Sequence, residues 1–472
     1  MPNGTVVELG GTYFNSSFVR LKQLISNYDL AVTSKQSDSP KASMHRPFHS
    51  IFFDALSGQR IKFGGDQRAF SFRCVFASLD FNHFLRQLDL MAAKVPLECP
   101  WEAENAQALD SRTVAQFIDE QLSNQQAKRT ARFFINLNVC AQPEEVSLLW
   151  FLWLVKQCGS ARSMIGAMRT GSEHKLAMGM QQLCDRLANE LNEDALKLNN
   201  GVVGCDYTAN CVVLRMRDFS LIKTQKVVFA IPLAVLAKIH FSPPLTPLMN
   251  QTPYKQPMGA CIRFVVHYDR PFWNELNFSG HLMINSDQCS LFTYDDTRNA
   301  SFGLTGFLVA DCARARADMQ SHERQEWIVN QLAIALQDDR FRTPLSYEEH
   351  NWMQDQYIGG GFNSYAGPGY LTIYKPALKS NDTIFLAGCD LSPKMINSLE
   401  GALLSAEEAV HQVAKAFNKQ TKLMEYPIDS STLPEEQTFW QKWAPSSYGL
   451  MKMGAVTIVV STVAMRLIST NK

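Results

Sequence analysis

Short apolar runs alternate along the chain with longer segments in which apolar residues recur every three or four positions. Near the start, Phe18, Leu21, Leu24 and Ile25 follow that helical spacing and predict a helix. Before it, the run from Val6 to Leu9 predicts a short strand that stops at a Gly-Gly pair. We therefore expect the chain to open with a strand followed by a helix.

Further helices and strands follow in mixed order. We predict a helix that Ser78 caps and that runs to about Ala93, a largely helical segment over 113–137, a helix that opens at Pro143, and a strong helix over Leu399–Phe417. The apolar run of the third helix, LLWFLWLV, is too short to cross a bilayer, so we expect that helix to be buried. The predicted strands are Lys226–Ile231, Ile262–Tyr268, Phe302–Ala310 and Thr383–Leu386. Because helices and strands alternate without a fixed repeat, the fold class is mixed α/β.

The last part of the chain carries a different apolar segment. From Met453 to Met465 the residues are apolar or small, and Lys452 and Arg466 flank this stretch. Because long basic side chains can reach the polar edge of a bilayer, the segment attains the ~20 residues that a membrane-spanning helix needs. We predict a tail anchor over residues 448–470; the alternative is a buried or interfacial helix.

Composition narrows the function classes. The 472 residues carry 45 Lys and Arg against 45 Asp and Glu, and this balance disfavours a nucleic-acid binder, which usually has a basic excess. The length predicts roughly two or three domains. The 11 cysteines are scattered without a CxxC pair, so neither a disulfide framework nor a zinc site is indicated, and a reducing compartment is the simplest interpretation. The first residues, MPNGTVVELGG, lack the basic and apolar regions of a secretory signal peptide.

One local pattern could bind an anion. The run from Ile384 to Phe417 predicts a strand that ends at Gly388, a short irregular segment, and a long helix that starts near Asn397. The free backbone N–H groups and positive dipole end of such a helix suit a phosphate or the pyrimidine oxygen of a reduced flavin. An ordinary strand–helix crossover has the same pattern. The sequence contains neither GxSxG nor GxGxxG, so neither a hydrolase elbow nor the standard dinucleotide fingerprint is indicated.

Ordered segments over nearly the full length resemble the flavin-containing monoamine oxidases. They are VELGGTYF, FFINLNVCAQPEEVSLLWFLWLVKQCG, FAIPLAVLAKIHFSPPL, YEEHNWMQDQY with the following GGGFNSY, FLAGCDLSPKMINSLEGA and the terminal apolar span. The resemblance implies an α/β fold of two domains, one of them a flavin domain built from separated chain segments. It assigns residues 1–50, 178–252 and 355–416 to the FAD-binding domain, 51–177 and 253–354 to the substrate domain, 417–447 to a C-terminal extension and 448–470 to the anchor.

The chain departs from this family at its start. Family members begin with a strand and a GxGxxG turn that hold the pyrophosphate of FAD, whereas this sequence begins at what would be the following flavin contact. The resemblance therefore implies a fold that lacks the first βαβ unit, and weak FAD binding by the chain as written. Either the sequence is an incomplete product, or it has lost tight FAD binding.

Three residues match the family's catalytic positions. Arg263 matches a lysine that is water-bridged to the flavin; the alternative is a strand arginine in a structural ion pair. Phe362 and Ser398 match the two tyrosines that flank the amine, and only Phe362 keeps an aromatic face. Gly361 stands where the family has the cysteine that links FAD covalently, so the resemblance implies non-covalent FAD.

The remaining matches concern the cofactor and the substrate. The cofactor-binding residues that the resemblance implies are Gly10, Gly11, Thr12, Tyr13, Val202, Trp352, Gly361, Gly388, Cys389, Asp390 and Leu399. The substrate-binding residues that it implies are Leu137, Asn138, Ile165, Ser172, Phe292 and Phe307. The second set is mainly apolar and would suit an arylalkylamine, although each residue taken singly also fits a plain core position. No metal site is expected.

The function that the resemblance implies is FAD-dependent oxidation of primary amines to aldehyde, ammonia and hydrogen peroxide, which the departures could impair. One alternative is an inactive, membrane-anchored relative with a binding or regulatory role; another is a truncated product of a full-length oxidase. The implied partners are a small-molecule amine, O2 and a membrane, with no nucleic acid, and a homodimer is left open. The implied location is the mitochondrial outer membrane, with a tail anchor and the catalytic domain facing the cytosol.

Overall fold

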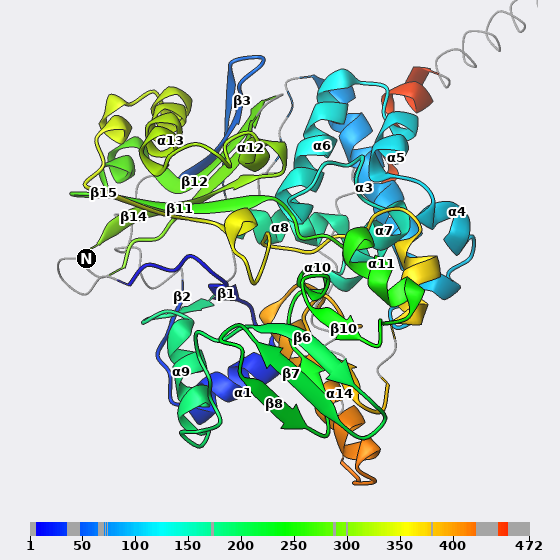
Figure 1. Cartoon of the computed structure of the whole chain (residues 1–472). Helices are drawn as coiled ribbons and strands as arrows, with labels where there is room; N and C mark the ends of the chain where they lie inside the picture. Colours follow the sequence, from blue (N-terminus) through cyan, green and yellow to red (C-terminus); the bar gives the residue numbers. More distant parts are fainter. Residues whose placement is uncertain are drawn as a thin grey trace, which may run out of the picture.

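The structure is a computed structural model of the chain (Figure 1). It describes residues 6–34, 48–64, 70, 72, 74–170, 174–286, 289–298, 301–378, 381–421 and 442–451. Helices and strands are mixed throughout these ranges, which confirms the predicted α/β class. The predicted domain boundaries stay a prediction.

A seven-stranded sheet organises one half of the molecule. Its strands, in spatial order, are β15 (Ser346–Asn351), β11 (Cys261–Tyr268), β14 (Phe302–Val309), β13 (Cys289–Asp295), β12 (Phe278–Ser286), β3 (His49–Asp54) and β4 (Gln59–Phe63). Neighbouring strands are antiparallel except β12 and β3, which are parallel. The helices α12 (Asp311–Arg314) and α13 (Ser321–Leu336) lie against this sheet (Figure 1). Because helices pack on both faces, β11 is buried along its whole length, which explains its nearly unbroken apolar sequence.

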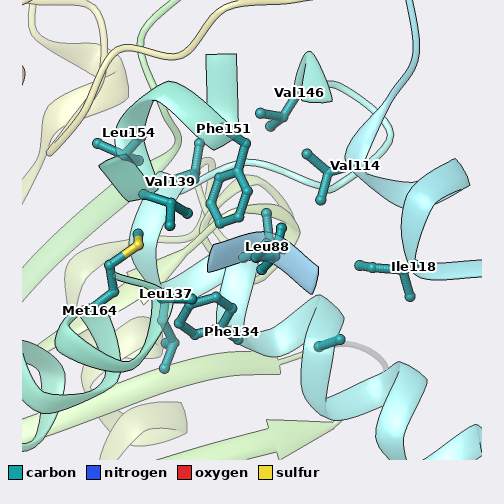
Figure 2. Packing of buried hydrophobic residues seen from close by; sticks show 14 of the residues in the cluster. Leu88, Val114, Ile118, Phe134, Leu137, Val139, Val146, Phe151, Leu154 and Met164 are labelled. Carbon is teal, nitrogen blue, oxygen red and sulfur yellow. The ribbon is translucent and has the colours of Figure 1, made fainter. Parts of the chain in front are cut away.

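A helical layer packs against the other face of the sheet. It contains α3 (Val75–Ala93), α4 (Ala106–Asp110), α5 (Val114–Gln121), α6 (Gln125–Val139), α7 (Leu148–Gln157) and α8 (Ala161–Thr170). Its apolar side chains form one cluster with Met283 and Phe292 of the sheet. Within this cluster Phe134 and Phe151 meet edge-on at 6.3 Å between ring centroids (Figure 2). The helix α7 is buried on all sides, as its length and apolar composition predict.

A third group of elements lies below the large sheet in Figure 1. Its strands form a sheet β10 (His240–Ser242), β6 (Val202–Tyr207), β7 (Val212–Met216) and β8 (Leu221–Thr224), a parallel pair β9 (Val227–Phe229) and β16 (Ile384–Leu386), and a small sheet β1 (Tyr13–Phe14), β5 (His174–Leu176) and β2 (Val32–Ser34). Its helices are α1 (Val19–Asn27), α9 (Gln181–Asn189), α10 (Leu233–Leu236), α11 (Pro247–Lys255) and α14 (Leu399–Ala416). Two helices that lie far apart in the sequence meet here, because α1 packs on α14 (Figure 1).

Elements with a strong local pattern form close to their predicted bounds. The helices predicted around Leu21 and over Leu399–Phe417 are α1 and α14, and the helix predicted to end at Ala93 is α3. The four predicted strands correspond to β9, β11, β14 and β16. These predictions are confirmed because each element buries one consistent apolar face or run.

Two predictions near helix starts are wrong. Helix α3 begins at Val75 with Cys74 at its N-cap, so Ser78 lies inside the helix and does not cap it. Helix α7 begins at Leu148, after Ser147, whose hydroxyl accepts from the Trp150 N–H. The apolar pattern located both helices but not their first residues; Ser147 caps α7, whereas Cys74 makes no side-chain cap hydrogen bond at the start of α3.

One further prediction is confirmed, and another is wrong. The segment 113–137 is largely helical, as predicted, and it forms two helices: α5 ends at Gln121, and α6 starts after Asn124, whose side chain accepts from two backbone N–H groups. The run Val6–Leu9 is not a strand. It has no neighbouring strand, and its Leu9 carbonyl accepts from the Trp352 indole instead.

No helix within the described ranges is both long and apolar enough to cross a bilayer. Apart from residues 448–451, the predicted anchor lies outside the described residues, as does most of the predicted extension over 417–447.

Candidate active site

A buried arginine stands at the centre of the candidate site. Arg263 lies in β11, and its Nη1 donates hydrogen bonds to the Gly10 carbonyl oxygen and, at 2.8 Å, to Thr12 Oγ1. Its Nε donates to Thr305 Oγ1 at 3.4 Å. Its Nη2 is buried and has no hydrogen-bond partner among the described residues. Burial raises the pKa of the adjacent Tyr13. The site therefore presents a buried cationic donor that lacks an acceptor among the described residues.

An ion-pair network lies beside Arg263. Arg298 contacts Glu8 at 2.7 Å and Asp296 at 3.1 Å, and Lys175 contacts Asp296 at 3.4 Å. Glu8, Lys175 and Asp296 are buried, and Arg298 is largely buried. Burial lowers the pKa of Arg263, and Asp296 and Glu8 oppose that shift. Three cations face two anions here, so the group carries one net positive charge. The sequence analysis did not identify these four residues. The signal that could have found them is a charged residue inside or next to an otherwise apolar run.

The Gly10–Gly11 turn runs close to two of the residues predicted with it. The Trp352 indole Nε1 donates to the Leu9 carbonyl at 2.9 Å. A Cβ atom at Gly10 would lie 3.9 Å from the Trp352 ring, and one at Gly11 would lie 3.3 Å from the Leu399 side chain. A side chain at Gly11 would therefore push Leu399 away, which explains the glycine. The structure brings this turn, Trp352 and Leu399 together with Arg263.

The segment around Gly361 closes the same region. The Gly361 N–H donates to the Gly259 carbonyl at 2.8 Å, and the peptide bond to Phe362 is cis. A Cβ atom at Gly361 would lie 3.4 Å from Trp352. Phe362 is 44% exposed, and its ring meets Phe307 edge-on at 5.7 Å. An aromatic ring thus faces open space next to the buried arginine.

Three phenylalanine rings form a continuous surface on this side of the sheet. Phe307 in β14 pairs directly opposite Arg263 in β11, and the guanidinium carbon lies 5.1 Å from the centre of the Phe307 ring. Phe307 stacks on Phe292 with centroids 4.8 Å apart. Together with Phe362, these rings can receive an apolar or cationic group.

The other predicted substrate residues lie in or near the helical layer. Leu137 is buried in the core beside Phe134 (Figure 2). Asn138 Nδ2 donates to the Phe134 carbonyl at 2.8 Å. Ile165 in α8 is half-buried against the same core. Ser172 lies outside the described residues.

Ser398 has a structural task in this protein. It is the N-cap of α14, where its Oγ accepts from the Gly401 N–H at 3.0 Å and donates to the Met395 carbonyl at 2.5 Å. The hydroxyl is therefore engaged at the start of the helix. Its neighbour Leu399 reaches the Gly10–Gly11 turn, so Ser398 borders the site.

A second group of predicted cofactor residues follows β16. Gly388 N–H donates to Ser405 Oγ of α14 at 3.0 Å, and Asp390 Oδ2 accepts from the Leu233 N–H at 3.1 Å. Burial raises the pKa of Asp390, although this hydrogen bond lowers it. Cys389 between them is only partly buried. Val202 lies further away, in β6, packed against the apolar cluster around β9 and β16.

Comparison with known proteins adds the family context. The sequence profile described as flavin containing amine oxidoreductase matches residues 1–414. The chain is 32% identical to the flavin-containing amine oxidase of Danio rerio over 407 residues, which cover 84% of this chain and 78% of that protein. It is also 32% identical to flavin-containing amine oxidase B of Homo sapiens over 396 residues, covering 82% and 76% of the two chains.

Solved structures show the same fold at lower identity. Cyclohexylamine oxidase from Brevibacterium oxydans IH-35A superposes with a TM-score of 0.78 at 24% identity over 88% of each chain. A putrescine oxidase with bound putrescine superposes with a TM-score of 0.76 at 20% identity, again over 88% of each chain. At these identities the likeness establishes the architecture alone.

Proposed function

The chain belongs to the family of flavin-containing amine oxidases, and from this membership we propose that it oxidises primary arylalkylamines. FAD is the cofactor of this family. The proposed products are an aldehyde, ammonia and hydrogen peroxide. The observation that carries the proposal is the buried Arg263, whose Nη2 lacks an acceptor and which lies beside an aromatic surface.

The residues around Arg263 fit the ring end of FAD. The flavin ring has nitrogen and oxygen acceptors along one edge, and Arg263 Nη2 is a buried donor without a partner among the described residues. The glycines at 10 and 11 leave the backbone bare between Trp352 and Leu399. We therefore expect Arg263, Gly10, Gly11, Trp352 and Leu399 to hold the ring.

When bound, FAD would accept hydride equivalents from the amine α-carbon and pass them to O2. The chain's own residues would bind the amine and orient it. Phe362, Phe307 and Phe292 offer an aromatic wall to the aryl group and the amine nitrogen. Arg263 keeps a permanent positive charge in a buried position, which favours electron density on the groups it contacts.

The test is replacement of Arg263 in the purified chain. We expect Arg263→Met to lower kcat/KM for benzylamine or tyramine at least tenfold, because a charge-assisted hydrogen bond is worth about 1.5–3 kcal/mol. Arg263→Lys should retain much of the rate, since lysine keeps the charge. Peroxide release and the flavin absorbance spectrum are the two measurements.

Arg270 provides the matched control. It lies just beyond the end of β11, and its side chain is 60% exposed. Arg270→Gln should leave kcat/KM and flavin content unchanged. If Arg263→Met behaves like Arg270→Gln in both measurements, Arg263 has no part in the site and the proposal is wrong.

We further propose that the flavin is bound without a covalent link. Gly361 stands at the position of the family's linking cysteine and offers no sulfur. Acid precipitation of the flavin-loaded protein should therefore release the yellow colour into solution. Colour that stays with the precipitate would refute this.

The inactive alternative has its own supporting observation. The Ser398 hydroxyl is engaged in capping α14, so one wall of the presumed amine path lacks both a ring and a free polar group. A protein of this kind could keep the fold as a binding module. Flavin absorbance with no peroxide from any amine would favour it over the oxidase.

We also propose that residues 448–470 anchor the protein in the mitochondrial outer membrane. The support is the stretch Met453–Met465 between Lys452 and Arg466. Ending the chain after Pro445 should move the protein from the membrane fraction to the soluble fraction. An unchanged membrane fraction would contradict the anchor.

A further inference from the structure

A pair of buried thiols lies away from the proposed site. Cys289 is the first residue of β13 and Cys312 lies in α12, and both cysteines are free. Their Sγ atoms are 3.3 Å apart and share a hydrogen bond, which either thiol can donate. Both side chains are buried, but Asp311 and Ala315 on the same short segment are exposed. The pair is therefore buried, with exposed residues on both sides of Cys312 in the same segment.

A cation makes the two thiols unequal. The guanidinium carbon of Arg316 lies 3.6 Å from the centre of the Trp327 ring. Arg316 Nη1 donates to the Cys312 carbonyl at 3.0 Å, and the same nitrogen lies 3.7 Å from Cys312 Sγ. Burial raises the pKa of Cys312, but the hydrogen bond with Cys289, the charge of Arg316 and a backbone hydrogen bond from Ser290 together lower it below its ordinary value. Cys312 is therefore the cysteine of the pair that more readily forms a thiolate.

The partner thiol is shifted the other way. The hydrogen bond with Cys312, together with burial and the charge of Cys312, raises the pKa of Cys289. One sulfur is therefore prepared to attack an oxidant, and its neighbour keeps its proton. This division matches what a reactive and a resolving cysteine require.

A second buried thiol pair provides an internal comparison. Cys140 hydrogen-bonds to Cys261, and both are buried. Burial and the Cys261 thiol raise the pKa of Cys140 well above its ordinary value, although backbone hydrogen bonds from Phe362 and Asn363 lower it. Cys140 of this pair is held in the thiol form, so proximity alone should not make the pair reactive.

We propose that Cys289 and Cys312 form a disulfide in response to hydrogen peroxide. The Cys312 thiolate attacks one oxygen of the peroxide, the O–O bond breaks, and the departing hydroxide takes up a proton as water. Cys289 then attacks the Cys312 sulfenic acid, the S–O bond breaks, and a second water leaves with the Cys289 proton. Two thiols lose two electrons in total, and one peroxide is reduced to two waters.

The geometry requires only a small movement. A disulfide bond is about 2.0 Å long, so the two sulfurs must approach by about 1.3 Å from their present distance. Peroxide is also a product of the proposed amine oxidation, but the oxidant can be added, so the inference does not rest on the proposed function.

The experiment exposes the full chain to hydrogen peroxide without amine or FAD. After alkylation and digestion, mass spectrometry should find a peptide that links Cys289 to Cys312, while Cys140 and Cys261 remain alkylated. The exposed Cys184 reports the dose of oxidant. Absence of the linked peptide at a dose that oxidises Cys184, or earlier linkage of Cys140 to Cys261, would overturn the proposal.

Single variants assign the two roles. In Cys289→Ser, dimedone should trap a sulfenic acid at Cys312, and in Cys312→Ser it should not label Cys289. Arg316→Gln should slow formation of the linked peptide by about fivefold or more, because less thiolate is present, while Arg316→Lys should react close to the wild-type rate. Equal rates in all three proteins, or labelling of Cys289 instead of Cys312, would show that the arginine does not prepare this pair.

Discussion

Lys375 is a half-buried ammonium group whose charge is only weakly compensated by neighbouring groups. It lines a cavity of about 720 Å³ between α14 and the helical layer, and its Nζ donates to the Leu391 carbonyl at 3.3 Å. Burial lowers the pKa of Lys375 to about 8, and the charge of Asp390 only partly opposes this shift. Keeping Lys375 charged inside the fold therefore costs stability at neutral pH.

We predict that Lys375→Met stabilises the protein at pH 7 by about 1–2 kcal/mol. Unfolding raises the pKa of the lysine to its ordinary value, so between pH 8 and that value the unfolded chain binds more protons. The stability of the wild type should consequently rise through this window, and the advantage of the variant should shrink. Urea unfolding at pH 7 and pH 9.5 measures both effects.

Lys415 supplies the control for this prediction. It lines the same cavity from α14 but is exposed. Lys415→Met should change the free energy of unfolding little at either pH. A Lys375→Met variant that is less stable than the wild type at pH 7 would mean that Lys375 is held by an interaction that outweighs its burial.

At the residue scale, the sequence indicated candidate site residues but not the contacts that surround them. The resemblance indicated Arg263, Gly361 and Phe362, and the structure places all three around one surface, while their roles stay a prediction. It could not predict that Arg263 bonds to the Gly10 carbonyl or that Ser398 caps a helix. Those partners are fixed by packing between distant segments, which local patterns do not record.

The joint between α1 and α14 depends on one buried carboxylate. Glu400 Oε1 accepts from the Arg20 N–H at 2.8 Å, and Oε2 accepts from the Leu21 N–H at 3.0 Å. Glu400 lies in the first turn of α14 and is fully buried, and it satisfies two free N–H groups at the start of α1. Helices α1 and α14 are thereby joined.

We predict that Glu400→Ala lowers the free energy of unfolding by about 2–4 kcal/mol, because two buried N–H groups lose a charged acceptor. Glu400→Gln should lose less, since the amide oxygen can still accept one bond. Thermal and urea unfolding are the measurements. Glu408→Ala, an exposed change on the same helix, should have little effect, and an equal loss in both alanine variants would refute the joint.

Elements were predictable where their pattern is local. Helix α1 follows from its own apolar spacing, and β11 follows from an apolar run. The run Val6–Leu9 looks equally like a strand, but its backbone bonds to an indole more than three hundred positions away. A strand needs a neighbour, and a single sequence does not say whether one is near.

Residues 442–447 of the C-terminal segment are hydrogen-bonded to the helical layer. Asp80 of α3 is buried, and its two carboxylate oxygens accept from the Ser447 N–H at 2.7 Å and the Asn124 N–H at 3.1 Å. Arg86 of the same helix donates to the carbonyls of Lys442 and Ala444, both at 3.0 Å. One helix therefore holds the segment 442–447 in place.

We predict that Asp80→Ala releases this segment locally. Loss of a charged acceptor worth about 1.5–3 kcal/mol should raise the rate of tryptic cleavage after Lys442 roughly tenfold or more, without unfolding the molecule. Asp119→Ala, which removes an exposed partner of Lys128, is the control. Unchanged cleavage after Lys442 in Asp80→Ala would show that the segment is held by other contacts.

The contacts of residues 8–10 also limit how early this segment can fold while the chain is being synthesised. Glu8, Leu9 and Gly10 bond to partners that follow them by 290, 343 and 253 positions, respectively. At about 5–20 residues per second, a ribosome needs on the order of tens of seconds to reach those partners. The beginning of the chain therefore emerges early but docks late, and the site around Arg263 is assembled only near the end of translation.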